Sequence, residues 1–325
     1  MALWHWRRTR TAVAEPGTPP AAEALVADSL AALGWPPAVG EVVLLAGGRS
    51  GAQVFLVETA SRRVVLKVTE DPGWRRPALR ELAVYQTEDR VRAAFRPRLL
   101  AAQDDGAAVR LLLAAHEPYP PARELGEDDW LAVAAGLGQL HRLPLPPGRW
   151  PGPPGRPTSQ AVAAALREWD RHGWSGVAAR AARRLAAATG TGPGPVLAHG
   201  DCHVGNLVRG PGGRPCWVDW QEACLGSGLG DLVFLWQRAE FDGARPPRTA
   251  MTSTYAGARG VRLDDGLRSA LDGVELRLPL LSWPAFLGYG SGAGRQVMGD
   301  RLAELASRTD PGRAPTARPA GRGPR

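Results

Sequence analysis

The chain has 325 residues, of which 44% are hydrophobic and 22% are charged, a balance typical of a soluble globular protein. No apolar run reaches the length of a membrane span, and the N-terminus lacks the apolar stretch of a signal peptide, so we expect no membrane association. The net charge of +8 would suit a nucleic-acid partner. However, it comes partly from the C-terminal tail and is otherwise spread out, so we expect no nucleic acid.

The predicted elements begin after a flexible leader at 1–22. The apolar runs of 41–69, separated by the turn sequences GGRSG and TASRR, predict three consecutive strands. Residues 75–92 carry apolar side chains at helical spacing, and 96–116 predicts two strands around an Asp-Asp-Gly turn. At the other end of the chain, 307–325 is rich in Arg and Pro and is predicted to be disordered. The first part of the chain is therefore a small sheet with one helix.

The later part of the chain is predicted to be mainly helical. Residues 127–142 form an amphipathic helix with acidic residues in its first turn. Two further helices over 159–189 are separated near Gly173. We therefore expect an α+β fold of two lobes, a sheet lobe at 23–115 and a larger helical lobe at 116–306. Three cysteines without a Cys-x-x-Cys pair predict reduced thiols and a cytoplasmic protein.

Lys67 is the only lysine beside 39 arginines. Codon bias explains the excess of arginine, and under that explanation a single lysine is an accident on a solvated strand. A functional explanation is that Lys67 serves a narrow cleft, because an ammonium is a compact point charge whereas a guanidinium is a wide planar fork. Its position at the end of the apolar run VVLK does not decide between these explanations, and the rest of the sequence must.

The stretch VLAHGDCHVGNLVRGPGGRPCWVDW, residues 196–220, concentrates the polar groups that suggest chemistry. An apolar run leads into Asp201, and Asn206 follows five residues later. A GPGG turn then returns the chain through a second apolar run to Asp219. Two short strands around a turn would aim these three side chains at one region. Carboxylate and amide oxygens suit Mg²⁺, which takes few protein ligands and uses nucleotide phosphates for the rest.

The order of motifs resembles the aminoglycoside phosphotransferase and choline-kinase-like family, which has a protein-kinase-like fold. HGDCHVGN resembles the kinase catalytic loop and VDW the second metal motif. GGRSGAQVF resembles the family's nucleotide loop, VVLK its strand-three lysine, and Arg80-Glu81-Leu82 its helix glutamate. The segment GLGDL resembles the family's motif after the metal aspartate. The resemblance runs from about 42 to about 236, with a looser helical match beyond.

This resemblance implies a nucleotide-binding first lobe and a second lobe for catalysis and substrate binding. The γ-phosphoryl group would move from ATP or GTP to a hydroxyl of a small molecule. Asp201 would accept the hydroxyl proton, while Asn206 and Asp219 would hold Mg²⁺. Lys67, paired with Glu81, would position the α- and β-phosphates. The loop predicted to cover the phosphates contains Gly47, Gly48, Ser50 and Gly51.

The acceptor is left open by the sequence. The resemblance points first to an aminoglycoside or another antibiotic. Glu240, Asp242, Asp264 and Asp265 would either form an acidic pocket for such a cation or be ordinary surface charges. Other members of the family phosphorylate homoserine, choline, methylthioribose or sugars. A nucleotide-binding pseudokinase is an alternative of another class, although the intact motif positions argue against it. No oligomeric state is predicted.

Several residues near the motifs have structural interpretations. His199 is expected to brace the loop, and Asp231 to cap the next helix or brace the same loop. His203 faces either substrate or solvent, and the sequence favours neither. Cys202 lies between these histidines, but the spacing matches no zinc site. Three tryptophans are predicted to be core residues: Trp217, Trp220 and Trp236.

Overall fold

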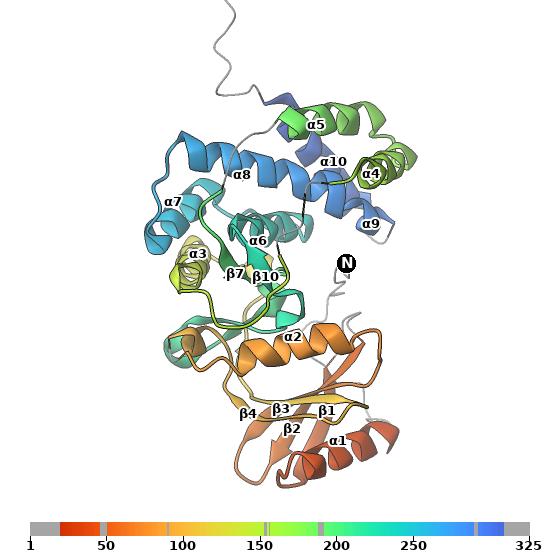
Figure 1. Cartoon of the computed structure of the whole chain (residues 1–325), viewed down its shortest axis with the longest axis vertical. Coiled ribbons are helices and arrows are strands. Elements are labelled where there is room, and N and C mark those ends of the chain that lie inside the picture. The colour runs from red at the N-terminus through yellow and green to blue at the C-terminus, as the bar shows by residue number, and fades with distance from the viewer. Residues whose placement is uncertain are drawn as a thin grey trace, which may run out of the picture. The chain divides into compact units, whose positions relative to one another are not determined.

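The computed structural model describes residues 20–45, 51–89, 91–152, 155, 157–187, 192–288 and 292–308. The chain divides into two compact units, Met1–Arg156 with Pro193–Arg262 and Pro157–Gly192 with Leu263–Arg325 (Figure 1). All predicted site residues belong to the first unit, so the site can be described within one body. The predicted lobe boundary between 115 and 116 stays a prediction.

The first unit begins with a helix and a five-stranded antiparallel sheet of order β1-β2-β3-β5-β4. These elements are α1 (Pro20–Ala32), β1 (Ala38–Leu45), β2 (Ala52–Thr59), β3 (Arg63–Thr69), α2 (Arg75–Tyr85), β4 (Leu99–Asp104) and β5 (Val109–Ala114). The three consecutive strands and the strand pair around the Asp-Asp-Gly turn are thus confirmed. Helix α1 has no counterpart among the predicted elements and begins inside the segment predicted as a leader, of which residues 1–19 lie outside the described part.

The sheet separates α1 from α2 (Figure 1). Val64, Leu66 and Val68 of β3 are buried in one core cluster with Val26 and Leu30 of α1. Side chains alternate between the two faces of a strand. Val65 and Lys67 alternate with these residues along β3. They therefore belong to the opposite face of the sheet, where α2 lies.

Helix α2 is shorter than the predicted helix at 75–92. It ends at Tyr85, and the chain restarts in the short 3-10 helix η1 (Arg92–Phe95). Asp89 Oδ1 accepts hydrogen bonds from the main-chain N–H of Val91 at 2.9 Å and of Arg92 at 3.1 Å. Asp89 therefore caps the start of η1, and the predicted helix is divided into two separate segments.

The remainder of the first unit consists of short strands and three helices around the predicted catalytic loop. Its elements are β6 (Glu117–Pro118), η2 (Ala122–Glu124), α3 (Glu127–Arg142), β7 (Val196–Ala198), η3 (Val204–Asn206), β8 (Leu207–Arg209), η4 (Pro211–Gly213), β9 (Pro215–Trp217), η5 (Trp220–Glu222), β10 (Cys224–Gly226), α6 (Leu229–Phe241) and α7 (Arg248–Arg259). Strand β8 pairs with β6 and β9, and β7 pairs with β10. Helix α3 has the predicted bounds, and Asp129 accepts the main-chain N–H of Gly126 at 3.1 Å to cap its first turn.

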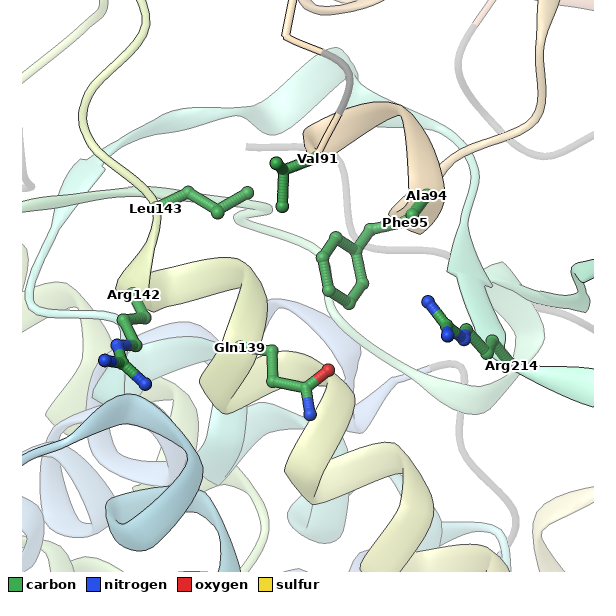
Figure 2. A pocket seen from close by; sticks show the side chains of 7 residues that line it. All are labelled: Val91, Ala94, Phe95, Gln139, Arg142, Leu143 and Arg214. Atoms are coloured by element: carbon green, nitrogen blue, oxygen red, sulfur yellow. The ribbon is translucent and has the colours of Figure 1, made fainter.

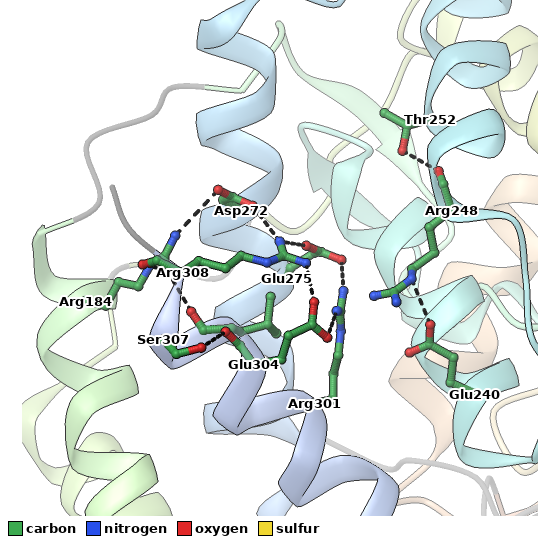
Figure 3. A network of polar contacts seen from close by, with 11 residues as sticks. Arg184, Glu240, Arg248, Thr252, Asp272, Glu275, Arg301, Glu304, Ser307 and Arg308 are labelled. Carbon is green, nitrogen blue, oxygen red and sulfur yellow. Dashed lines mark hydrogen bonds and ion pairs between the residues drawn. The ribbon is translucent and has the colours of Figure 1, made fainter. Parts of the chain in front are cut away.

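The second unit is helical over its described residues. It contains α4 (Ser159–Arg171), α5 (Ser175–Ala187), α8 (Asp265–Arg277), the π-helix η6 (Leu278–Ser282), α9 (Pro284–Leu287) and α10 (Gly292–Ser307). Helices α4 and α5 are separated at Gly173, which has φ +83°, as predicted. Arg301 and Arg308 both bind Glu275 in a network that ties α10 to α8 (Figure 3). None of the described helices is long and apolar enough to cross a membrane. Of the predicted tail, residues 309–325 lie outside the described part.

Candidate functional site

Lys67 lies buried at the centre of an ion-pair cluster. Its Nζ donates to Glu81 Oε2 at 2.6 Å and to Asp219 Oδ1 at 2.8 Å. The side chains of Lys67, Glu81 and Asp219 are 7%, 1% and 11% exposed. Burial lowers the pKa of the Lys67 ammonium, but the charges of Asp219 and Glu81 outweigh it and raise the pKa above its ordinary value. The lysine is therefore charged, and β3, α2 and the segment after β9 meet at it.

Asp201 and Asn206 meet in the loop that joins β7 to β8. Asn206 Nδ2 donates to the main-chain oxygen of Asp201 at 2.9 Å and to its Oδ2 at 3.2 Å. Both residues are buried. Gly200 before them has φ +82°, and a Cβ there would lie 2.1 Å from the main-chain oxygen of Glu222, so the turn requires glycine. The HGDCHVGN motif thus forms a closed loop held by its own hydrogen bonds.

The β8–β9 hairpin brings Asp219 beside this loop. Leu207 pairs with Trp217 across the hairpin, and the main-chain N–H of Val218 donates to Asn206 O at 3.0 Å. Asp219 has φ +65° and is the one non-glycine with positive φ in the described part of the chain. Such a backbone costs about 1–3 kcal/mol and often marks a functional site. In this chain the left-handed backbone occurs at the residue whose carboxylate contacts the buried ammonium of Lys67.

Asp231, at the start of α6, holds the catalytic loop through hydrogen bonds to the loop's main chain. Its carboxylate accepts the main-chain N–H of His199 at 2.6 Å and of Gly200 at 2.9 Å, and His141 Nε2 lies 3.1 Å from it. His199 Nε2 lies 2.9 Å from Val218 O. Burial lowers the pKa of both histidines, which favours their neutral form. The structural interpretations of Asp231 and His199 are confirmed, whereas no sequence pattern pointed to His141.

The nucleotide loop is described only at its end. Gly47, Gly48 and Ser50 lie outside the described residues. Gly51 has φ +62°, and a Cβ there would lie 2.2 Å from Cδ1 of Trp74. The position therefore requires glycine, while the role of the loop stays a prediction.

The tryptophans in and after the motif, and the cysteine within it, belong to the core. Trp217, Trp220 and Trp236 are buried, as predicted. The indole N–H of Trp217 donates to Sγ of the buried Cys202 at 3.2 Å. Burial raises the pKa of the Cys202 thiol well above its usual value, which disfavours the thiolate that a nucleophile needs.

The residues present offer a site of the kind that Mg²⁺ uses. Among the described residues no three His, Cys, Asp or Glu side chains are grouped to hold an ion. Asp219 and Asn206 supply a carboxylate and an amide, and they lie on the two ends of one hairpin. Mg²⁺ needs only one or two carboxylates when substrate phosphates complete its shell. The donor set therefore fits a magnesium–nucleotide complex.

Three of the four acidic residues considered for an acceptor pocket, all except Asp265, contact neighbouring groups. In the first unit, Arg248 pairs with Glu240 at 3.1 Å (Figure 3), and Arg238 with Asp242 at 3.1 Å. In the second unit, Asp264 caps α8 by accepting the main-chain N–H of Leu267. These three carboxylates have local structural partners, which favours their interpretation as ordinary surface charges.

A cavity of about 530 Å³ lies elsewhere in the first unit, between η1, the end of α3 and the β8–β9 turn. Figure 2 shows its apolar lining by Val91, Phe95 and Leu143, with Arg142 and Arg214 at its sides. None of the predicted site residues lines it, so this cavity is separate from the cluster at the buried lysine.

Comparison with known proteins gives a family match over most of the chain. A family model named APH and described as a phosphotransferase enzyme family matches residues 41–268. No curated protein matches the chain significantly in sequence.

Three solved structures share the fold. A choline/ethanolamine kinase family protein from Mesorhizobium loti is 16% identical with a TM-score of 0.58, covering 89% of this chain and 94% of its own. Spectinomycin phosphotransferase APH(9)-Ia, in complex with ADP and spectinomycin, is 12% identical with a TM-score of 0.58, covering 87% and 97%. A thermostable mutant of aminoglycoside phosphotransferase APH(4)-Ia, in complex with ADP and hygromycin B, is 15% identical with a TM-score of 0.56, covering 87% and 98%. At these identities the likeness concerns the fold, and it confirms the protein-kinase-like fold class.

Proposed function

The chain belongs to the APH phosphotransferase enzyme family and is a small-molecule kinase, and from this premise we propose that it transfers the γ-phosphoryl group of ATP to a hydroxyl group of its acceptor. The observation that carries the proposal is the convergence of Lys67, Glu81 and Asp219, from three separate segments, beside the loop of Asp201 and Asn206. These are the five positions that phosphoryl transfer in this fold requires.

The chain's own side chains would act mainly by positioning. Asp201 orients the acceptor hydroxyl and takes its proton as the oxygen attacks phosphorus. Lys67 places its charge on the α- and β-phosphates, and Glu81 holds the lysine in place from α2. Because Lys67 also contacts Asp219, nucleotide binding would exchange part of this ion pair for phosphate contacts. The nucleotide loop would cover the phosphates with main-chain N–H groups.

Asn206 and Asp219 would hold Mg²⁺, which when bound neutralises charge on the phosphates. The Asp219 carboxylate is held by the Lys67 ammonium, and the Asn206 amide is held by its hydrogen bonds to Asp201. Both donors are thus ordered before the nucleotide arrives. This preorganisation lowers the cost of forming the reactive complex.

For the acceptor we propose the hydroxyl of an aminoglycoside or another antibiotic, with a role in resistance. Family membership supports this class, and the solved neighbours include proteins bound to hygromycin B and to spectinomycin. Choline, homoserine and sugars are the comparison acceptors. We also propose a cytoplasmic location, which the three unbridged cysteines support.

The experiment is a transfer assay with Mg²⁺ and either ATP or GTP. The panel contains hygromycin B, spectinomycin, kanamycin, choline, homoserine and ribose, and phosphorylated products are detected by mass spectrometry. We expect a product with one acceptor and none with Asp201→Asn, whose ADP affinity should stay within about threefold of the wild type. A product formed by Asp201→Asn at the wild-type rate would contradict the proposal.

A further inference from the structure

His203 and Asp201 each have a buried polar atom without a partner. Asp201 Oδ1 and His203 Nε2 form no hydrogen bond within the described part of the chain. Their side chains are only 3% and 4% exposed. Buried polar atoms are almost always hydrogen-bonded, so a pair of exceptions at adjacent side chains requires an explanation.

The two side chains lie close together without a direct hydrogen bond between them. His203 Nε2 lies 3.7 Å from Asp201 Oδ2, which is too long for a direct hydrogen bond. The same distance allows a single oxygen atom to lie within hydrogen-bond reach of both side chains, at about 2.8 Å from each. Asn206 already donates to Oδ2, and Oδ1, the other oxygen of the same carboxylate, is the one without a partner.

The imidazole of His203 is held in place, unlike a surface side chain. Its ring meets the ring of Phe234 edge-on, with centroids 6.2 Å apart. The main-chain oxygen of His203 accepts the N–H of Asn206 at 2.9 Å, which anchors the backbone of His203 within the catalytic loop. The unpartnered nitrogen is therefore a fixed feature of the site.

We propose that His203 is a second residue that binds the acceptor hydroxyl, an inference that rests on the proposed function. In the Nε2–H tautomer it donates a hydrogen bond to the acceptor oxygen, while that oxygen donates its own proton to Asp201. The oxygen attacks the γ-phosphorus, and a new O–P bond forms as the bond to the bridging oxygen of ADP breaks. The proton passes to Asp201, and ADP leaves with the bonding pair.

This arrangement uses all four directions around a hydroxyl oxygen. One direction holds the carbon, one the proton for Asp201, one the lone pair bound by His203, and the last the lone pair aimed at phosphorus. An amine nitrogen has a single lone pair, so it cannot accept from His203 and attack phosphorus at once. The site therefore selects alcohols over amines as the reacting group, even in acceptors that carry both.

The test uses water as the acceptor, because water offers the same proton and lone pairs and needs no identified substrate. Mg²⁺-dependent ATP hydrolysis is measured for the wild type, His203→Gln and His203→Asn, with hygromycin B and spectinomycin added in parallel reactions. The amide nitrogen of glutamine can reach the place of Nε2, whereas that of asparagine reaches only the place of Nδ1. His172→Asn, at a partly exposed histidine of the second unit, controls for the substitution itself.

We expect His203→Asn to lower hydrolysis about 10- to 100-fold and His203→Gln to stay within about threefold of the wild type. ADP affinity and melting temperature should change little in either variant, which separates positioning of the acceptor from a structural role. If His203→Asn hydrolysed ATP at the wild-type rate while Asp201→Asn was inactive, the inference about His203 would be wrong and the proposed function would still stand. Wild-type hydrolysis by Asp201→Asn would instead contradict the proposed function.

Discussion

Replacing Lys67 by arginine keeps the positive charge and changes only its shape. The lysine fits between Glu81 at 2.6 Å and Asp219 at 2.8 Å with 7% of its side chain exposed. Arginine adds two heavy atoms to this enclosed space, and overpacking of this kind costs about 1–3 kcal/mol. A shift of the charge by about 1 Å costs on the order of 100-fold in rate. We expect Lys67→Arg to lose both stability and kcat in these amounts.

The assay combines urea denaturation with the transfer or hydrolysis rate. Lys67→Met removes the charge at similar length and leaves Glu81 and Asp219 without their cation, so we expect a loss of about 3–5 kcal/mol. The control is Arg75→Lys, which replaces arginine by lysine in a more exposed ion pair with Asp104. It should change the free energy of unfolding by less than about 0.5 kcal/mol. A Lys67→Arg variant with wild-type stability and kcat would refute the reasoning that a guanidinium does not fit.

Two further predictions concern the catalytic loop and its support. Gly200→Ala places a Cβ 2.1 Å from the main-chain oxygen of Glu222 at φ +82°, so it should cost about 2 kcal/mol or more in urea denaturation; Gly230→Ala, with open space around it, should be nearly neutral. The lowered pKa values of buried His141 and His199 mean that the unfolded chain binds protons first on acidification. Stability should thus be full above about pH 6.5 and fall below it by up to about 1.4 kcal/mol per pH unit for each histidine. Denaturation midpoints at pH 7.5 and 5.5 check this, and a protein that gains stability at pH 5.5 would contradict it.

The parts of the site that are close together in the sequence could be predicted well. Asn206 and Asp201 are only five positions apart in one loop, which makes their hydrogen bonds predictable. A hairpin with a GPGG turn brings the segment before Asp219 to Asn206, whose main-chain oxygen accepts the N–H of Val218. Lys67 and Glu81 could be paired because a short connection joins their strand to the next helix. In these cases local chain geometry leaves few alternatives.

Features that depend on tertiary packing could not be predicted. His141 reaches Asp231 across 90 residues of sequence, and no local pattern marks a helix histidine as a brace for a distant loop. Helix α1 is recognisable only when Val26 and Leu30 are seen to cover the sheet. The unpartnered nitrogen of His203 is likewise a property of packing, and the sequence left that residue between substrate and solvent.

The most direct test of the account is the comparison of nucleotide binding with turnover in Asp201→Asn. ADP affinity in the presence of Mg²⁺ is measured by calorimetry, and release of phosphate from ATP is measured on the same preparation. Retained affinity with turnover reduced by at least about 100-fold would support Asp201 as the base of a phosphotransferase. Retained affinity with unchanged turnover would show that the loop of Asp201 binds nucleotide without performing the proposed chemistry.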